Sequence, residues 1–106
     1  LKFASENIRF LFVNSCFSSP QAESAVSFIE GAIGMKDSVG DEAARVFAAQ
    51  FYSAIGFGKS VAVAFGQAKA ALLLEGIGEE EIPELFLQQG IDAENFILVE
   101  PSIDIE

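Results

Sequence analysis

The sequence predicts an α/β fold in which short buried strands alternate with amphipathic helices. Ile8–Val13 and Ala32–Met35 are short and predominantly apolar, which is typical of strands that are covered on both faces. Longer segments between and after them place their apolar residues at helical spacing. Strands separated by helices favour a mostly parallel sheet with right-handed crossovers and helices on its faces.

The first helix is predicted between these two strands. Ser19 is a favoured N-cap residue, and Pro20 suits the first turn because its missing N–H needs no partner there. The helix is expected to end at Gly31. Five apolar residues are expected to share its buried face: Ala22, Ala25, Val26, Phe28 and Ile29.

Two longer helices are predicted in the middle of the sequence. Asp41 is expected to cap a helix that runs to about residue 55 and stops at Gly56. Ser60 is expected to cap a third helix over residues 61–75, which Gly76 closes. The wide apolar stripe of the second helix predicts deep burial, and it consists of Ala44, Val46, Phe47, Phe51, Ala54 and Ile55.

The C-terminal part of the sequence has less regular patterns. We expect Pro83–Gln89 to form one helical turn or an irregular segment, and Phe96–Val99 to form a third strand. Residues 102–106 are expected to form a frayed tail. Three strands leave the Ile8–Val13 strand short of neighbours, and the sequence begins at Leu1 rather than Met, so we expect a fragment of a larger domain.

Composition and charge argue against several classes of function. The 106 residues are 51% hydrophobic and include 11 Phe, which suits one packed domain or part of one. Six basic residues against sixteen acidic ones give a net charge of −10, so binding to nucleic acid or to an anionic membrane surface is disfavoured. No apolar run approaches the ~20 residues that span a bilayer. A single cysteine forms no internal disulfide, which favours the reducing cytoplasm.

No cofactor or metal site is predicted. Gly58-Lys59-Ser60 matches the end of a phosphate-binding loop, but the glycine required five residues before Gly58 is Ser53, so a turn with a serine cap is favoured. A chain with no histidine and one cysteine does not supply a zinc site. We interpret the acidic run Glu79–Glu81, with Glu84, as a solvated loop rather than a cation site.

The sequence offers one candidate nucleophile, Cys16. It follows the apolar run Phe10–Val13 after Asn14 and Ser15, so we expect it at the mouth of a buried strand, fixed by the core yet reachable from solvent. Ligands of open α/β sheets bind outside the carboxyl ends of the strands. A cysteine nucleophile usually takes its thiolate character from an imidazole, and this sequence contains none. The alternative is an inert, apolar cysteine.

Several segments follow one another at a characteristic spacing, although none is specific alone. They are Phe12–Ser18, Ala32–Met35, Val39–Ala44 with Phe47 and Phe51-Tyr52, Gly58–Val61, Ala64-Phe65, Ala68-Lys69 and Pro83–Phe86. In this order they resemble the CHAT domain, a bacterial family of caspase-like peptidases found beside tetratricopeptide repeats. The resemblance runs from about Ile8 to Val99.

The resemblance implies a three-layer caspase-like α/β sandwich, of which residues 1–106 are the C-terminal, nucleophile-bearing half. Cys16 matches the family nucleophile, whereas the strand that carries the family histidine would precede Leu1. In related members of the clan an acidic residue shapes a pocket for a basic side chain, and the resemblance makes Asp41, with Asp37 as the alternative, the candidate for that role. Asp41 also has a plainer explanation, because it and Glu42 suit the first turn of a helix.

Two functions of different classes follow. In the first, the chain is a fragment of a bacterial caspase-like cysteine endopeptidase, and the fragment is inactive alone. Its intact parent is expected to cleave a peptide or protein substrate through Cys16. Backbone N–H groups near Cys16 are the expected oxyanion donors. In the second, it is a non-catalytic caspase-like module for assembly or regulation. An incomplete sheet leaves an open edge and an apolar flank, so we expect association with the missing N-terminal half or with a second copy.

Overall fold

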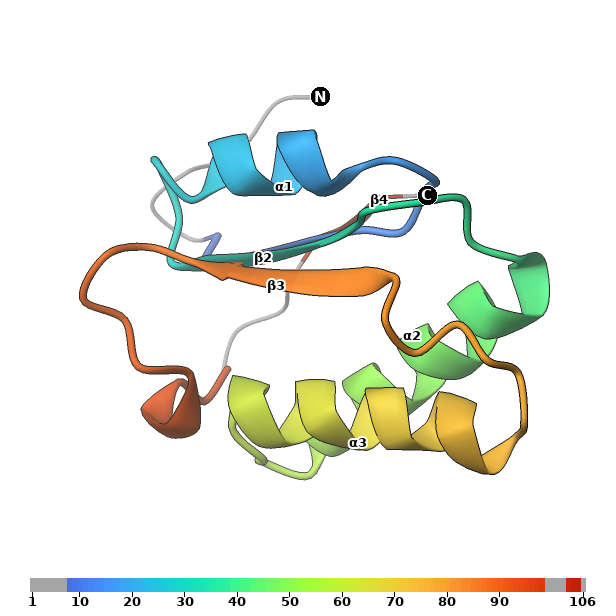
Figure 1. The fold of residues 1–106 in the computed structure, drawn as a ribbon. Coiled ribbons are helices and arrows are strands. Elements are labelled where there is room, and N and C mark those ends of the chain that lie inside the picture. Colours follow the sequence, from blue (N-terminus) through green and yellow to red (C-terminus); the bar gives the residue numbers. More distant parts are fainter. Residues whose placement is uncertain (1–7, 99–102, 106) are drawn as a thin grey trace.

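The structure, a computed structural model, describes residues 8–98 and 103–105. A four-stranded sheet carries one helix on one face and two helices on the other, which confirms the predicted α/β architecture (Figure 1). The helices are α1 (Ser19–Ala25), α2 (Asp41–Gly56) and α3 (Val61–Leu74), with a short 3₁₀ helix η2 (Ala93–Asn95). The strands are β1 (Phe10–Val13), β2 (Gly31–Met35), β3 (Pro83–Leu87) and β4 (Ile103–Ile105).

The sheet is mixed rather than wholly parallel. Its order is β3-β2-β1-β4; β1 pairs in parallel with both β2 and β4, and β2 pairs antiparallel with β3. Pro83–Leu87 is therefore a strand, and the predicted helical turn or irregular segment there is wrong. Pro83 is the first residue of a strand at the edge of the described sheet, a position that tolerates the missing N–H.

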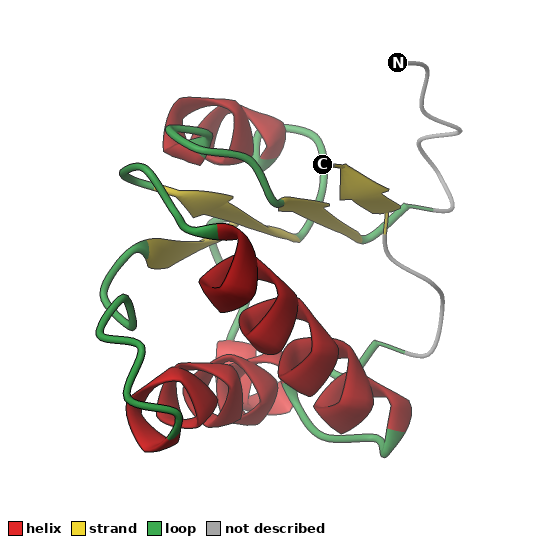
Figure 2. Cartoon of the chain, turned by 90° about the vertical axis from the view of Figure 1, so that its right-hand side faces the viewer, coloured by secondary structure: helices red, strands yellow, loops and turns green. Residues whose placement is uncertain are grey.

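Strand β1 distributes its side chains between two cores. Phe10 and Phe12 face α2 and α3, and they belong to the larger apolar cluster below the sheet. Leu11 and Val13 face the opposite side, where they pack with Ala22 of α1. All four β1 side chains are buried, so the prediction of a strand covered on both faces is confirmed. The end view shows the same three layers (Figure 2).

The larger core is built mainly from aromatic rings. Phe51 of α2 stacks on Phe10 with ring centroids 5.6 Å apart, and it meets Phe12 edge-on at 5.8 Å. Phe47, one helical turn earlier, also meets Phe12 edge-on at 5.8 Å. Offset and edge-to-face contacts of this kind add to the gain from burial. These contacts fix α2 beneath β1, and α3 packs against α2.

Two further predictions for the C-terminal part need correction. Phe96–Leu98 forms no strand beyond a single bridge between Ile97 and Ser60, and Val99 lies outside the described residues. Phe96 and Leu98 alternate with exposed Ile97 because both bury their side chains in the larger core. Ile103–Ile105, expected to be frayed, pairs with β1; residues 102 and 106 are not described.

The predicted helix boundaries are partly wrong. Helix α1 ends at Ala25 rather than Gly31, and Phe28, assigned to its buried face, lies beyond it with 82% of its surface exposed. The cap of α2 is Gly40, so Asp41 is its first helical residue instead. The cap of α3 is confirmed, because the Ser60 side chain accepts a hydrogen bond from the Val63 N–H. None of the helices in the described part of the chain has the length and hydropathy of a membrane span.

Candidate functional site

Cys16 lies at the edge of the sheet where the parallel strands β1 and β2 both end. Residues 14–18 form the loop after β1, and residues 36–40 form the loop after β2. Because β1 and β2 are hydrogen-bonded neighbours, their two loops lie side by side. Cys16 therefore occupies the edge at which open α/β sheets bind ligands, as its place in the sequence predicts.

The Cys16 thiol is exposed and contacts the loop after β2. Its Sγ accepts a hydrogen bond from the Val39 N–H, with 3.3 Å between nitrogen and sulfur. The same Sγ lies 3.6 Å from the Val39 carbonyl oxygen and 3.8 Å from the Ser38 Oγ. The sulfur is thus reachable from solvent while its position is set by a neighbouring loop.

A buried serine joins the bases of the two loops. The Ser18 hydroxyl donates to the carbonyl of Val13, the last residue of β1, at 2.8 Å. It accepts from the N–H of Met35, the last residue of β2, at 2.9 Å. Ser18 is 1% exposed, so these bonds are shielded from water.

Phe17, between the exposed cysteine and the buried serine, has an unusual backbone. Its φ is +56°, in the left-handed region that side chains other than glycine rarely adopt. Its N–H donates to the Asp37 carbonyl at 3.2 Å, which adds a second tie between the loops. That N–H is therefore already engaged, so it is not a ready oxyanion donor of the kind expected near Cys16.

Strand β2 and the start of α1 approach each other closely because β2 has a glycine, Gly34, at the point of contact. A Cβ added to Gly34 would lie 2.8 Å from the Ser18 carbonyl oxygen and 2.8 Å from the Ser19 Cα. The contacting atoms belong mainly to backbone, so they have little room to move. The glycine lets the start of α1 rest directly on β2.

The two predicted pocket carboxylates have different places at this edge. Asp37 belongs to the loop that contacts Cys16, and its Oδ1 accepts from the Ser38 N–H at 2.7 Å. Asp41 is exposed and lies with Glu42 in the first turn of α2, where negative charge interacts favourably with the helix dipole. Both explanations of Asp41, substrate pocket and helix start, are compatible with this position.

Glu79 and Glu84, which the sequence pattern assigned to a solvated acidic loop, accept hydrogen bonds from residues next to the site. The Glu79 Oε1 accepts from the Gly40 N–H at 2.9 Å, and the Glu84 Oε1 accepts from the Ser19 hydroxyl at 2.6 Å. These bonds tie the segment around β3 to the loop after β2 and to the start of α1. Their partners are 39 and 65 residues away in sequence, so no local pattern could have identified them.

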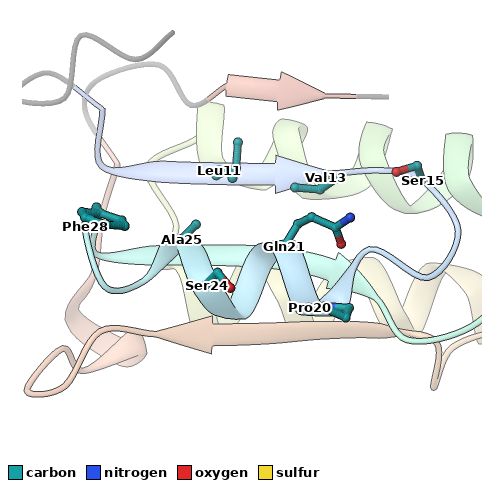
Figure 3. A pocket seen from close by; sticks show the side chains of 8 residues that line it. All are labelled: Leu11, Val13, Ser15, Pro20, Gln21, Ser24, Ala25 and Phe28. Atoms are coloured by element: carbon teal, nitrogen blue, oxygen red, sulfur yellow. The ribbon is translucent and has the colours of Figure 1, made fainter. Parts of the chain in front are cut away.

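An open apolar groove of about 790 Å³ runs along the α1 side of β1. Figure 3 shows Phe28 at one end of the groove and Ser15, next to Cys16, toward the other. The remaining lining residues come from β1 and α1: Leu11, Val13, Pro20, Gln21, Ser24 and Ala25. The exposed ring of Phe28 extends this apolar surface to solvent.

The arrangement leaves the Cys16 thiol free and exposed at this edge. The sequence contains no histidine, so this chain supplies no imidazole that could accept a proton from that thiol. Across residues 8–98 and 103–105, His, Cys, Asp and Glu side chains do not gather in threes in a way that could hold a metal ion. Comparison with protein-family models gives no match to this chain, and comparison with curated proteins gives no significant match.

Proposed function

We propose that this chain is the nucleophile-bearing part of a bacterial caspase-like cysteine endopeptidase of the CHAT type, inactive without its upstream part. One observation carries the proposal: Cys16 is exposed at the carboxyl edge of two adjacent parallel strands, on a loop braced by buried hydrogen bonds. The ordered segments that resemble the CHAT domain support it further. A single free thiol suits a cytoplasmic setting.

The proposed chemistry is acyl transfer through the thiol. Sγ bonds to the carbonyl carbon of the scissile peptide while its proton passes to an imidazole supplied by the upstream part. The same imidazole returns the proton to the leaving amine as the C–N bond breaks. Water then hydrolyses the thioester, releasing the new carboxyl terminus and restoring the Cys16 thiol.

The carboxylates near the site favour a basic residue on the substrate. Asp37 lies in the loop that contacts Cys16, and Asp41 follows on the first turn of α2. In this proposal Asp41, or Asp37 in its place, attracts the side chain that precedes the cleaved bond. The net charge of −10 acts in the same direction by raising the local concentration of cationic peptides.

Cleavage of reporter peptides by the chain joined to its upstream part tests this function. We expect hydrolysis after Arg or Lys, and a loss of roughly a thousandfold or more in Cys16→Ala, because no other group replaces the nucleophile. Ser53→Ala, at an exposed position late in α2, is the control and should retain full activity. Cleavage that survives Cys16→Ala, or an upstream part without an imidazole, would contradict the proposal.

A second candidate function, a non-catalytic assembly module, is favoured by the open apolar groove beside α1. Parallel sheets are normally covered on both faces, and a groove with an exposed Phe28 leaves apolar surface in water. Its proposed partner is the missing N-terminal half or a second copy of this chain. Nucleic acid and membrane surfaces are not proposed as partners, given the acidic charge.

Light scattering at high micromolar concentration tests the assembly function. We expect the chain to self-associate and Phe28→Ser to shift it toward monomer, because the exposed ring contributes apolar area to the contact. Phe57→Ser, an equally exposed ring at the turn between α2 and α3, is the control and should not change the distribution. A monomer at every concentration would count against self-association.

A further inference from the structure

We propose that Ser18 is a positioning residue for Cys16: its buried hydroxyl sets the place of the sulfur by locking the loops after β1 and β2 together. The inference rests on the proposed function in taking Cys16 as the nucleophile. It adds to that proposed site a residue whose side chain bonds to the two strand ends rather than to the sulfur. Ser18 acts at the base of the loops, two residues from the thiol.

The hydrogen bonds of the Ser18 hydroxyl run between the strands rather than to the helix that it precedes. Ser18 occupies the N-cap position of α1, yet its side chain makes no capping hydrogen bond. The Oγ instead donates to the Val13 carbonyl and accepts from the Met35 N–H. One hydroxyl thus joins the last residues of two neighbouring strands, from which the two loops depart.

The position of Cys16 depends on this connection through a short, constrained segment. Residues 14–17 bridge the gap between Val13 and Ser18, which the Ser18 hydroxyl closes at 2.8 Å. Within that closed segment Phe17 is held at φ +56°, and its N–H is bonded to Asp37 of the other loop. A left-handed phenylalanine persists only where surrounding contacts enforce it.

The position of the Cys16 sulfur therefore depends on how the loops after β1 and β2 lie relative to each other. Its contacts with Val39 and Ser38 all fall on the loop that begins just after Met35. Ser18 fixes Met35 relative to Val13, and the loops that carry Val39 and Cys16 begin at these two residues. Ser18 therefore also sets the distance between the Val39 nitrogen and the Cys16 sulfur. Removing the hydroxyl leaves the Met35 N–H and the Val13 carbonyl without this partner, and the strand ends must then rearrange.

Amide exchange measured by NMR on this chain tests the proposal directly. In Ser18→Ala we expect the Val39 amide to exchange about tenfold faster, the ratio that corresponds to the loss of about one hydrogen bond. The Cβ resonance of Cys16 should shift in the same protein. Ser60→Ala is the matched control, because Ser60 is also a buried serine at a helix start but lies far from Cys16 in the fold. It should leave both signals within twofold of the unsubstituted protein.

Each outcome decides the proposal. A Val39 amide that keeps its exchange rate in Ser18→Ala, or that speeds up equally in Ser60→Ala, would overturn it. If Ser18→Ala does not fold, Ser18→Cys replaces the hydroxyl by a thiol, which is a much weaker donor and acceptor, and an unchanged exchange rate at Val39 despite that weakening would overturn the proposal equally. The readout needs no peptidase activity, so failure of the proposed function and failure of this inference are observed separately.

Discussion

Replacing Phe51 by alanine is expected to lower the free energy of unfolding by about 3–5 kcal/mol. Phe51 is fully buried beneath β1, and its ring contacts Phe10, Phe12 and Phe47. The substitution removes the ring and leaves a cavity that the surrounding side chains fill only in part. Since a domain of this size is stable by about 5–15 kcal/mol, a large part of its stability depends on this one side chain.

Urea denaturation followed by circular dichroism measures this effect, with Phe57→Ala as the control. Phe57 follows α2 and is 82% exposed, so the same truncation there should change the free energy of unfolding by less than about 0.5 kcal/mol. Similar costs at the two positions would mean that the aromatic core is not placed as the structure describes it.

Gly34→Ala is expected to destabilise the protein by about 1–3 kcal/mol, although alanine is ordinarily the more favourable residue. The added Cβ would fall 2.8 Å from two backbone atoms of Ser18 and Ser19, and 2.9 Å from the Cβ of Ala22. Either β2 or the start of α1 must move, and the movement would also disturb the bonds of the Ser18 hydroxyl. We therefore expect altered amide resonances in the loop that carries Cys16.

The matched substitution for this test is Gly66→Ala. Gly66 lies in α3 with no atom within 4 Å of an added Cβ, so alanine there should stabilise the protein by about 0.5–1 kcal/mol. The two Gly→Ala changes are thus expected to have opposite signs in one thermal or urea titration. A neutral or stabilising Gly34→Ala would show that the start of α1 does not rest on β2.

The elements that local patterns define were predicted correctly. Strand β1 combines a short apolar run with burial on both faces, and α3 begins at its predicted serine cap. Strand β3 was missed because its conformation is imposed by antiparallel pairing with β2, some fifty residues earlier in the chain. Its side chains do alternate, with Leu85 and Leu87 toward the larger core and Phe86 toward the smaller one, and that alternation was the available signal.

The candidate site was predicted only in part, because contacts between residues distant in sequence leave no local pattern. The position of Cys16 follows from the end of β1, which a local pattern identifies. The contacts that hold it do not, because Ser18, Glu79 and Glu84 act through partners that only the fold brings near. Ser18 has a local explanation as a residue near a helix start, and that explanation conceals its role between the strands.

The site also explains how one chain can suit two functions. In the proposed peptidase the exposed thiol at the sheet edge is the nucleophile, and in the proposed assembly module the open groove beside Ser15 is the surface that a partner covers. Both features are satisfied if the same upstream part covers the groove and brings the imidazole to the thiol. A module that only assembles would need the groove and not the thiol.

The most direct test of the proposed function is mass spectrometry after labelling with a peptidyl chloromethyl ketone that ends in arginine. In the chain joined to its upstream part, the proposal predicts one adduct, located on Cys16, formed much faster than alkylation of the same thiol by iodoacetamide. The chain alone should show no such preference, because it lacks the imidazole. Labelling of Cys16 no faster than by iodoacetamide in the joined protein, or an adduct elsewhere, would contradict the assignment of Cys16 as the nucleophile.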